Sequence, residues 1–115
     1  MRGNWDTKVS LLDDPKKIVS SSLGDTLRVA GTAELAGTNK DIKQDRIRPL
    51  LGWVREYFPG VSTENYTPWA GLRPMTPDMM PLIFESKAKG IFYNTGHGHL
   101  GWTLGAITGK IISRI

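Results

Sequence analysis

A glycine-rich segment near the end of the chain is the strongest candidate for chemistry. Gly96, Gly98 and Gly101 stand between a strand-like run at 91–95 and a helical run at 102–114. This is the spacing of a loop that binds the phosphates of a dinucleotide. A complete dinucleotide unit needs a second strand and an acidic residue about 20 positions further on. Only 14 residues follow Gly101, so the full unit is excluded.

The physical properties of such a loop do not depend on the full unit. A glycine loop entering a helix lets a ligand approach the backbone, where N–H groups and the positive end of the helix dipole favour an anion. The alternative is a turn in which glycine only supplies a positive φ. The sequence leaves both interpretations open and favours the loop that faces a ligand.

Two histidines, His97 and His99, lie within this loop. At this spacing both could bind one metal ion. The sequence has no cysteine, no third histidine and no nearby cluster of carboxylates. We therefore predict that the loop histidines bond to local backbone and that the chain has no metal site.

Arg73 is the candidate for binding an anion through a side chain. It stands in the segment WAGLRP at 69–74, which is apolar and stiffened by proline. The planar fork of arginine binds a carboxylate through two parallel hydrogen bonds. The residues alone favour a plainer interpretation, a surface ion pair with Asp78 or Glu85.

The first third of the chain is predicted to form an antiparallel meander. Alternating, β-branched runs occupy 7–12, 16–22 and 26–35, and the tripeptide at 23–25 is typical of a tight turn. Gly31, inside the third run, indicates a bulge or a close approach of another segment.

A mid-chain helix is predicted next. Apolar residues recur every three or four positions: Ile47, Leu50, Leu51, Val54 and Phe58. The helix is expected over about 46–57, before Pro59. Pro49 is tolerated if the helix begins near Asp45, because the first turn has no N–H bonds to lose.

Prolines at 68, 74, 77 and 81 argue against a long central strand in the following segment. Short strands are expected at 69–73 and 82–85, with a turn at 86–90. The whole chain is therefore predicted to be α+β. Its antiparallel or mixed sheet carries a mid-chain helix and ends in a strand, a glycine loop and a helix.

Composition excludes several classes of protein. A chain of 115 residues that is 39% apolar forms one domain at most. Without cysteine it has no disulfide and no thiolate nucleophile. The net charge of +4 is evenly spread, so no basic stripe predicts binding to nucleic acid. No apolar run could span a bilayer, and a cytoplasmic location is expected.

Three segments together resemble the C-terminal part of the FAD-dependent D-amino-acid oxidase-like family. They are 26–35 (TLRVAGTAEL), 69–81 (WAGLRPMTPDMMP) and 93–109 (YNTGHGHLGWTLGAITG). The two later segments are specific in order and spacing, and the resemblance is weakest over 1–15. The family's N-terminal glycine fingerprint is absent. We therefore expect a fragment of a two-domain FAD oxidoreductase fold.

The resemblance implies that two parts of the chain belong to different domains. Residues 1–90 would be part of the substrate-binding domain, and 91–115 would be the last strand, loop and helix of the FAD-binding domain. The fragment would form a single compact unit. Residues of the loop would lie against FAD: Gly96, His97, Gly98, His99, Leu100, Gly101, Trp102 and Thr103. Arg73 would hold the substrate carboxylate, and the backbone carbonyl of His99 would lie near the substrate amine.

The resemblance also implies an activity, the oxidative deamination of D-amino acids to 2-oxo acids and ammonia. A dehydrogenase would pass the electrons to a quinone or another acceptor, in the cytoplasm or at the surface of the inner membrane. Departures from the family pattern occur at Met79 and Met80, at Phe84 and at His99. These departures affect the expected geometry of the local loops more than the expected function.

Three alternatives remain open: a flavin amine oxidase of the glycine or sarcosine oxidase type, a non-catalytic remnant, and a small basic binding module. The isolated chain is expected to be inactive and to bind no FAD. Its last helix has an apolar stripe that predicts self-association: Leu104, Ile107, Ile111 and Ile112.

Overall fold

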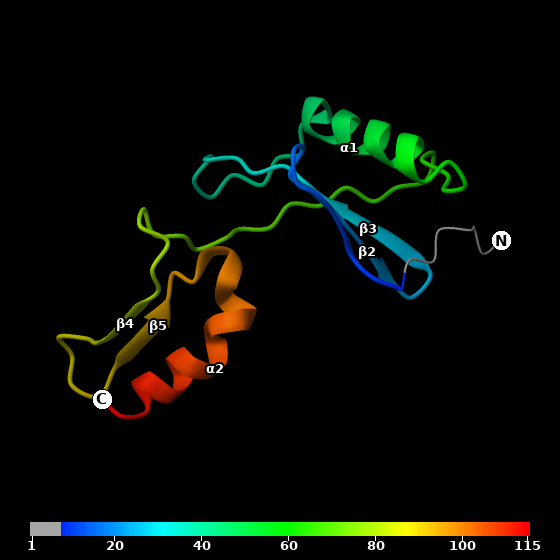
Figure 1. The fold of residues 1–115 in the computed structure, drawn as a ribbon. Helices are drawn as coiled ribbons and strands as arrows, with labels where there is room; N and C mark the ends of the chain where they lie inside the picture. The colour runs from blue at the N-terminus through cyan, green and yellow to red at the C-terminus, as the bar shows by residue number, and fades with distance from the viewer. Residues whose placement is uncertain (1–7) are drawn as a thin grey trace. The chain divides into compact units, whose positions relative to one another are not determined.

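A computed structural model describes residues 8–115 and confirms the α+β class (Figure 1). The elements, in chain order, are β1 (Leu11–Asp13), β2 (Ile18–Leu23), β3 (Thr26–Ala30), α1 (Gln44–Tyr57), β4 (Leu82–Glu85), β5 (Phe92–Thr95), a 3-10 turn η1 (Gly98–Leu100) and α2 (Gly101–Ile112). They form two compact units, Met1–Ala70 and Gly71–Ile115. Among the described residues, no helix has the length and apolarity needed to cross a membrane.

The first unit is the predicted antiparallel meander, in the strand order β1-β2-β3. Leu23 pairs with Thr26 across the expected tight turn, in which Gly24 has a φ of +58°. Directly paired residues share one face of a sheet. The pairs Asp13 with Ile18 and Ser20 with Val29 therefore define one face.

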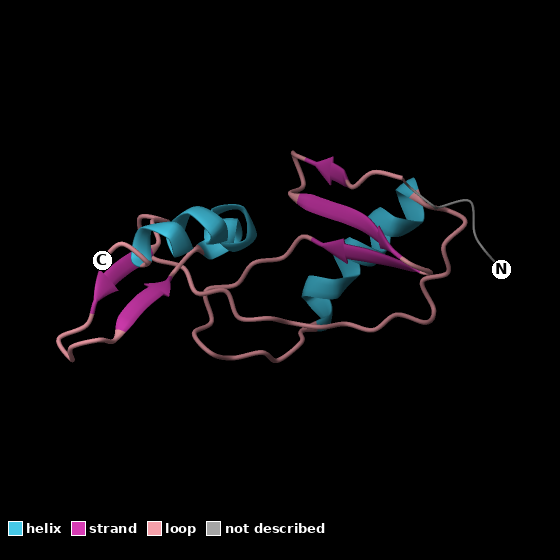
Figure 2. Cartoon of the chain, turned by 90° about the horizontal axis from the view of Figure 1, so that it is seen from below, coloured by secondary structure: helices cyan, strands magenta, loops and turns pink. Residues whose placement is uncertain are grey.

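Helix α1 covers that face of the meander (Figure 2). The small core consists of Ile18 from β2 and three residues at or just after the end of α1: Trp53, Val54 and Phe58. Partly buried apolar side chains pack around it: Leu27, Val29, Leu50 and Val61. The helical spacing seen in the sequence thus corresponds to a helix packed on a half-buried sheet.

Helix α1 begins two residues earlier than predicted, so Pro49 lies in its second turn. The backbone N–H of Arg46 donates to the carbonyl of Lys43 at 3.0 Å, which closes the chain into a turn before the expected start. Pro49 then cannot donate to the carbonyl of Asp45. Asp45 is exposed, so water can take the place of that donor.

Gly31 marks a close approach, one of the two outcomes predicted for it. A Cβ atom at this position would lie 2.8 Å from Cγ1 of Ile18 and 2.9 Å from Cδ2 of Leu50. The absence of a side chain at Gly31 therefore lets α1 and the sheet pack around the end of β3.

The second unit is a β-hairpin with one helix. Strands β4 and β5 pair antiparallel, with Phe84 opposite Tyr93, and their rings stack at a centroid distance of 5.0 Å. Helix α2 contacts both strands. The expected strands at 82–85 and 91–95 and the helix after the glycine loop are all present, with small shifts in their bounds.

The prediction of a short strand at 69–73 is wrong. These residues pair with no strand, and the prolines at 68 and 74, which lack a backbone donor, prevent the pairing from extending past either end. Pairing is confined to one isolated bridge, between Met75 and His97. The structure also groups β4 with β5 and α2, whereas we expected one compact unit for the whole chain.

We predict that Gly31→Ala lowers the free energy of unfolding by about 1–3 kcal/mol, the usual cost of overpacking a core. Both contacting groups are side chains already packed in place. Gly52→Ala is the control, because a Cβ there meets no atom within 4 Å and alanine favours a helix. Urea denaturation followed by circular dichroism measures both variants. Equal or greater stability of Gly31→Ala would contradict this description of the contact.

Candidate functional site

The glycine loop after β5 has a backbone that glycine favours at two points. Gly96 has a φ of +76° and is buried, and Gly98 has a φ of +56°. A Cβ atom at Gly96 would lie 3.0 Å from Cγ2 of Thr76. Both glycines are therefore required by the local conformation, whatever else the loop binds.

The loop leads directly into α2, whose N-terminus is not capped by a side chain. Leu100 occupies the N-cap position without a side-chain hydrogen bond, and the first turn contains no acidic residue. Trp102, in that turn, is fully exposed. The positive end of the α2 dipole is thus left without compensation by an acidic side chain of the first turn, which favours an anionic group beside it.

His97 fastens the loop to α2. Its Nε2 lies 3.0 Å from Oγ1 of Thr108, a side chain that is only 3% exposed. The Thr108 hydroxyl donates to the carbonyl of Leu104 at 3.0 Å, so it accepts from the Nε2–H of His97. The partner is therefore a side chain of α2 and not the local backbone that we predicted.

His99, in contrast, is exposed on η1. Among residues 8–115, no group of three or more histidine, cysteine, aspartate or glutamate side chains is arranged to hold a metal ion. The two histidines thus have different surroundings, one locked inside the loop and one facing outward.

The segment that contains Arg73 lies against the glycine loop. The backbone N–H of Gly98 donates to the carbonyl of Pro74 at 2.9 Å, and Met75 forms a bridge with His97. The structure therefore brings together the two parts of the chain that the sequence singled out, although more than 20 positions separate them.

Arg73 is exposed, and among the described residues it forms no ion pair with Asp78 or Glu85. Both carboxylates bond to their own turns. Asp78 accepts the backbone N–H of Met80 at 3.1 Å, and Glu85 accepts that of Gly90 at 3.2 Å. The hydrogen bond from Met80 lowers the pKa of Asp78. The surface ion pair favoured by the residues alone is thus not what the structure shows.

The turn that follows Arg73 adopts the conformation that glycine would favour at Met79, whose φ is +59°. Two hydrogen bonds hold this turn in place. Met79 N–H donates to the carbonyl of Thr76 at 3.1 Å, and the Thr76 hydroxyl donates to the carbonyl of Met80 at 2.8 Å. The departure from the family pattern at Met79 therefore leaves the turn itself intact.

Trp69 has a contact that sequence reasoning missed. The guanidinium carbon of Arg28, on β3, lies 5.2 Å from the centre of the Trp69 ring, which is a cation–π arrangement. Arg28 pairs with Ser21, on the sheet face opposite to α1. No pattern in the sequence links two residues that lie 41 positions apart.

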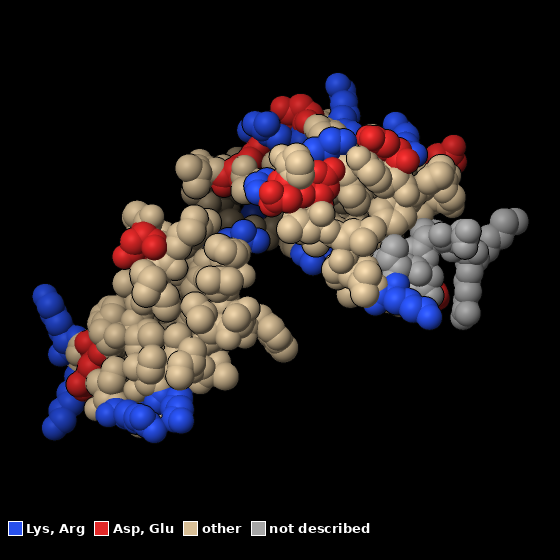
Figure 3. Space-filling model, viewed as in Figure 1, with Lys and Arg blue, Asp and Glu red and all other residues tan. Residues whose placement is uncertain are grey.

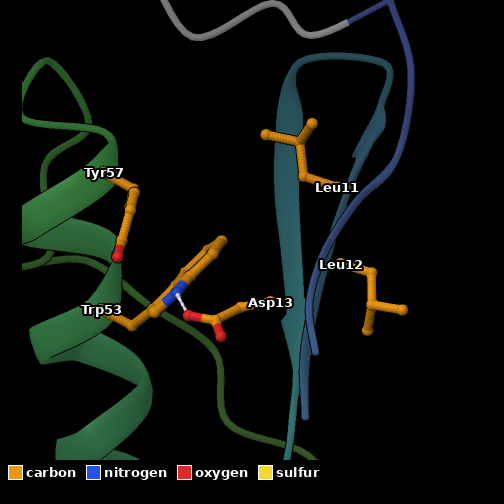
Figure 4. Close-up of a pocket in the computed structure, with 5 residues that line it drawn as sticks. All are labelled: Leu11, Leu12, Asp13, Trp53 and Tyr57. Atoms are coloured by element: carbon orange, nitrogen blue, oxygen red, sulfur yellow. Dashed lines mark hydrogen bonds between the residues drawn. The ribbon is translucent and has the colours of Figure 1, made fainter. Parts of the chain in front are cut away.

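The structure also has a shallow pocket of about 240 Å³ between β1 and α1 (Figure 4). Its lining consists of Leu11, Leu12, Asp13, Trp53 and Tyr57. The indole N–H of Trp53 donates to Asp13 at 2.8 Å. None of the predicted site residues lines this pocket, and its carboxylate is already used to hold α1 on the sheet.

Asp13 is also bonded by its own turn, since it accepts the backbone N–H of Lys16 at 3.1 Å. This bond, followed by that from Trp53, lowers the pKa of Asp13 below its ordinary value of 3.8. Lys16 in turn lies 3.3 Å from Glu56, and this hydrogen bond raises the pKa of Lys16. The edge of the first unit is thus fixed by charged groups at the surface.

The structure thus places the backbone next to Arg73 beside a glycine loop that leads into a helix N-terminus without a side-chain cap. The chain belongs to the FAD dependent oxidoreductase family, which it matches over residues 2–115. This confirms the resemblance seen in the sequence.

Two proteins that are similar to this chain are named D-amino acid dehydrogenases. The chain is 60% identical over 108 residues to D-amino acid dehydrogenase 3 of Mesorhizobium japonicum. The matched region covers 93% of this chain and 26% of the relative. It is 46% identical over 106 residues to D-amino acid dehydrogenase of Paramagnetospirillum magneticum, covering 91% and 25%. The chain thus spans about a quarter of the length of these relatives. No solved structure matches it.

We predict that Thr108→Val frees the imidazole of His97, because valine keeps the shape of threonine and removes the acceptor. In long-range nitrogen–proton NMR spectra, His97 should be the Nε2–H tautomer in the unaltered chain. The variant should show faster exchange of the Nε2 proton and a changed Nε2 chemical shift. An unchanged His97 signal would contradict the hydrogen bond.

A second prediction concerns Asp13. Because folding lowers its pKa, its contribution to stability is present above about pH 4 and is lost as the pH falls through the folded-state value. Asp13→Asn should therefore be less stable than the parent at pH 7, and the difference should shrink at pH 3. Urea midpoints measured across this range test it. Asp25→Asn, in the exposed β2–β3 turn, is the charge-matched control, because it removes one carboxylate without touching the bonds of Asp13 to Lys16 and Trp53.

Proposed function

We propose that this chain is part of an FAD-dependent D-amino acid dehydrogenase, which converts D-amino acids to 2-oxo acids and ammonia. The observation that carries the proposal is the hydrogen bond from Gly98 to the carbonyl of Pro74. It joins the arginine segment to the loop at the start of α2. The names of the relatives support the choice of substrate class.

The residues of the loop fit FAD as the cofactor. Gly96, Gly98 and Gly101 let a large flat ligand approach the backbone, and the uncapped start of α2 favours negative charge on that ligand. When bound, FAD supplies the two-electron acceptor for the oxidation. The remaining residues of the proposed cofactor contact are His97, His99, Leu100, Trp102 and Thr103. In the complete protein, 91–115 would belong to the FAD-binding domain and 1–90 to the substrate-binding domain.

Arg73 is the proposed anchor of the substrate carboxylate. Arg73 is exposed and is not paired with Asp78 or Glu85, and the backbone carbonyl of its neighbour Pro74 is bonded to the loop. The arginine fork suits a planar carboxylate and would fix which face of the substrate meets the cofactor. The backbone carbonyl of His99 would accept a hydrogen bond from the substrate amine.

The electrons would leave to a quinone or another carrier. The complete protein would act in the cytoplasm or at the surface of the inner membrane. A flavin oxidase of the glycine or sarcosine type would instead reduce oxygen. Peroxide formed in step with the 2-oxo acid would favour that alternative over a dehydrogenase.

We predict that Arg73→Ala lowers kcat/KM for a D-amino acid by about two to three orders of magnitude, equivalent to about 3–4 kcal/mol of transition-state binding. Truncation leaves the substrate carboxylate without its partner. Arg73→Lys keeps the charge but loses the fork, so its activity should lie between the two. The measurement uses a full-length hybrid, in which this chain replaces the matching segment of the Mesorhizobium relative.

Arg48→Ala is the matched control for this series, because Arg48 is an exposed arginine on α1, outside the proposed site. It should leave both kcat/KM and the flavin spectrum unchanged. If Arg73→Ala turned over within a few-fold of the parent hybrid, another cation would have to hold the substrate and this assignment would be rejected.

A further inference from the structure

The second unit has no apolar core of its own. The four buried apolar side chains among the described residues all precede Gly71. Within 71–115, the buried residues are Gly96 and Thr108. A two-stranded sheet with one helix is marginal in water without such a core. This unit therefore needs a further surface to pack against.

Helix α2 offers that surface. Trp102, Gly105, Ala106 and Gly109 follow the spacing i, i+3, i+4 and i+7, which places them on one side of the helix. We call these four residues the α2 face. Trp102 is fully exposed, and a Cβ atom at Gly105 or Gly109 would meet no atom within 4 Å. The backbone of α2 is thus open to close packing along this face.

Charge is sparse around this helix. Lys110 is the one charged residue between Gly101 and Ile112. In Figure 3, the side of the second unit that is visible is largely uncharged in its middle, and the charged side chains gather at its margins. An uncharged centre with a charged margin is the usual composition of a buried interface.

The apolar stripe expected to drive self-association is divided in the structure. Leu104 and Ile112 are half-buried, whereas Ile107 and Ile111 are 51% and 43% exposed. Helix α2 therefore presents no single stripe of four exposed aliphatic side chains to a second copy. The α2 face differs from this stripe because it combines the fully exposed Trp102 with two glycines at which a Cβ atom would meet no other group.

The relatives indicate what covers the α2 face. The Mesorhizobium protein is about four times as long as its match to this chain, and 60% of the matched residues are identical. A surface that packs on the rest of that protein would therefore be largely retained here. We propose that the chain docks through the α2 face onto the remainder of an FAD dependent oxidoreductase domain, even when that remainder is a separate polypeptide.

This docking rests on the family of the chain and not on the proposed activity toward D-amino acids. The test co-expresses the tagged 115-residue chain with the part of the Mesorhizobium relative that it does not match, about three quarters of that protein. We expect a 1:1 complex in size-exclusion chromatography with light scattering. The complex should show a visible flavin band after incubation with FAD, and this chain alone should show none.

Gly105→Leu is the decisive variant. Its side chain would project into the open space and hold the partner away, so association should weaken at least about ten-fold. Leucine favours a helix far more than glycine, so α2 should stay folded, which circular dichroism can check. Gly52→Leu, on α1, is the matched control, since a Cβ there also meets nothing within 4 Å. It should leave association unchanged.

Two results would overturn the docking. One is equal association of the parent chain and Gly105→Leu, and the other is self-association of the chain with no binding to the added polypeptide. A complex that forms and takes up FAD, but does not oxidise D-amino acids, would uphold the docking and reject the proposed function.

Discussion

The hydrogen bond from the N–H of Gly98 to the carbonyl of Pro74 is the constraint on which the candidate site depends. It aligns two segments that have little regular structure of their own, one rich in proline and one rich in glycine. The bridge between Met75 and His97 extends the same alignment. His97 then carries it into α2 through the buried hydroxyl of Thr108. The backbone that follows Arg73, the loop and the helix are therefore linked by a short series of hydrogen bonds within one unit.

The first unit is stabilised in a different way, by the packing of α1 on a meander. Its core is small, and polar contacts at the rim supplement it. Trp53 is the clearest case, because its ring lies in the core while its indole N–H reaches Asp13 on the edge strand. Gly31 serves the same packing by having no side chain. Burial and surface polar bonds thus act on the same few residues.

The second unit differs from the first because hydrogen bonds fix its segments while most of its apolar side chains stay exposed. The hairpin, the Met75–His97 bridge and the His97–Thr108 contact fix local geometry, yet aromatic rings such as Phe84 and Tyr93 stay nearly half exposed. The conformation of the loop is thus set by hydrogen bonds within the chain, whereas the aromatic and aliphatic surface of the unit stays open to further packing.

The sequence by itself determined the meander, the mid-chain helix, the hairpin and the family, because these depend on local periodicity, turn residues and motif spacing. It placed Gly96, Gly98 and Arg73 in the candidate site. It misplaced the strand at 69–73 and the start of α1, since propensity does not decide where a proline segment finds partners. Only the tertiary structure decided that Asp78 and Glu85 bond to their own turns, that His97 bonds to Thr108, and that Arg28 lies over Trp69. Each of these depends on which groups meet in space, and spacing along the chain does not determine that.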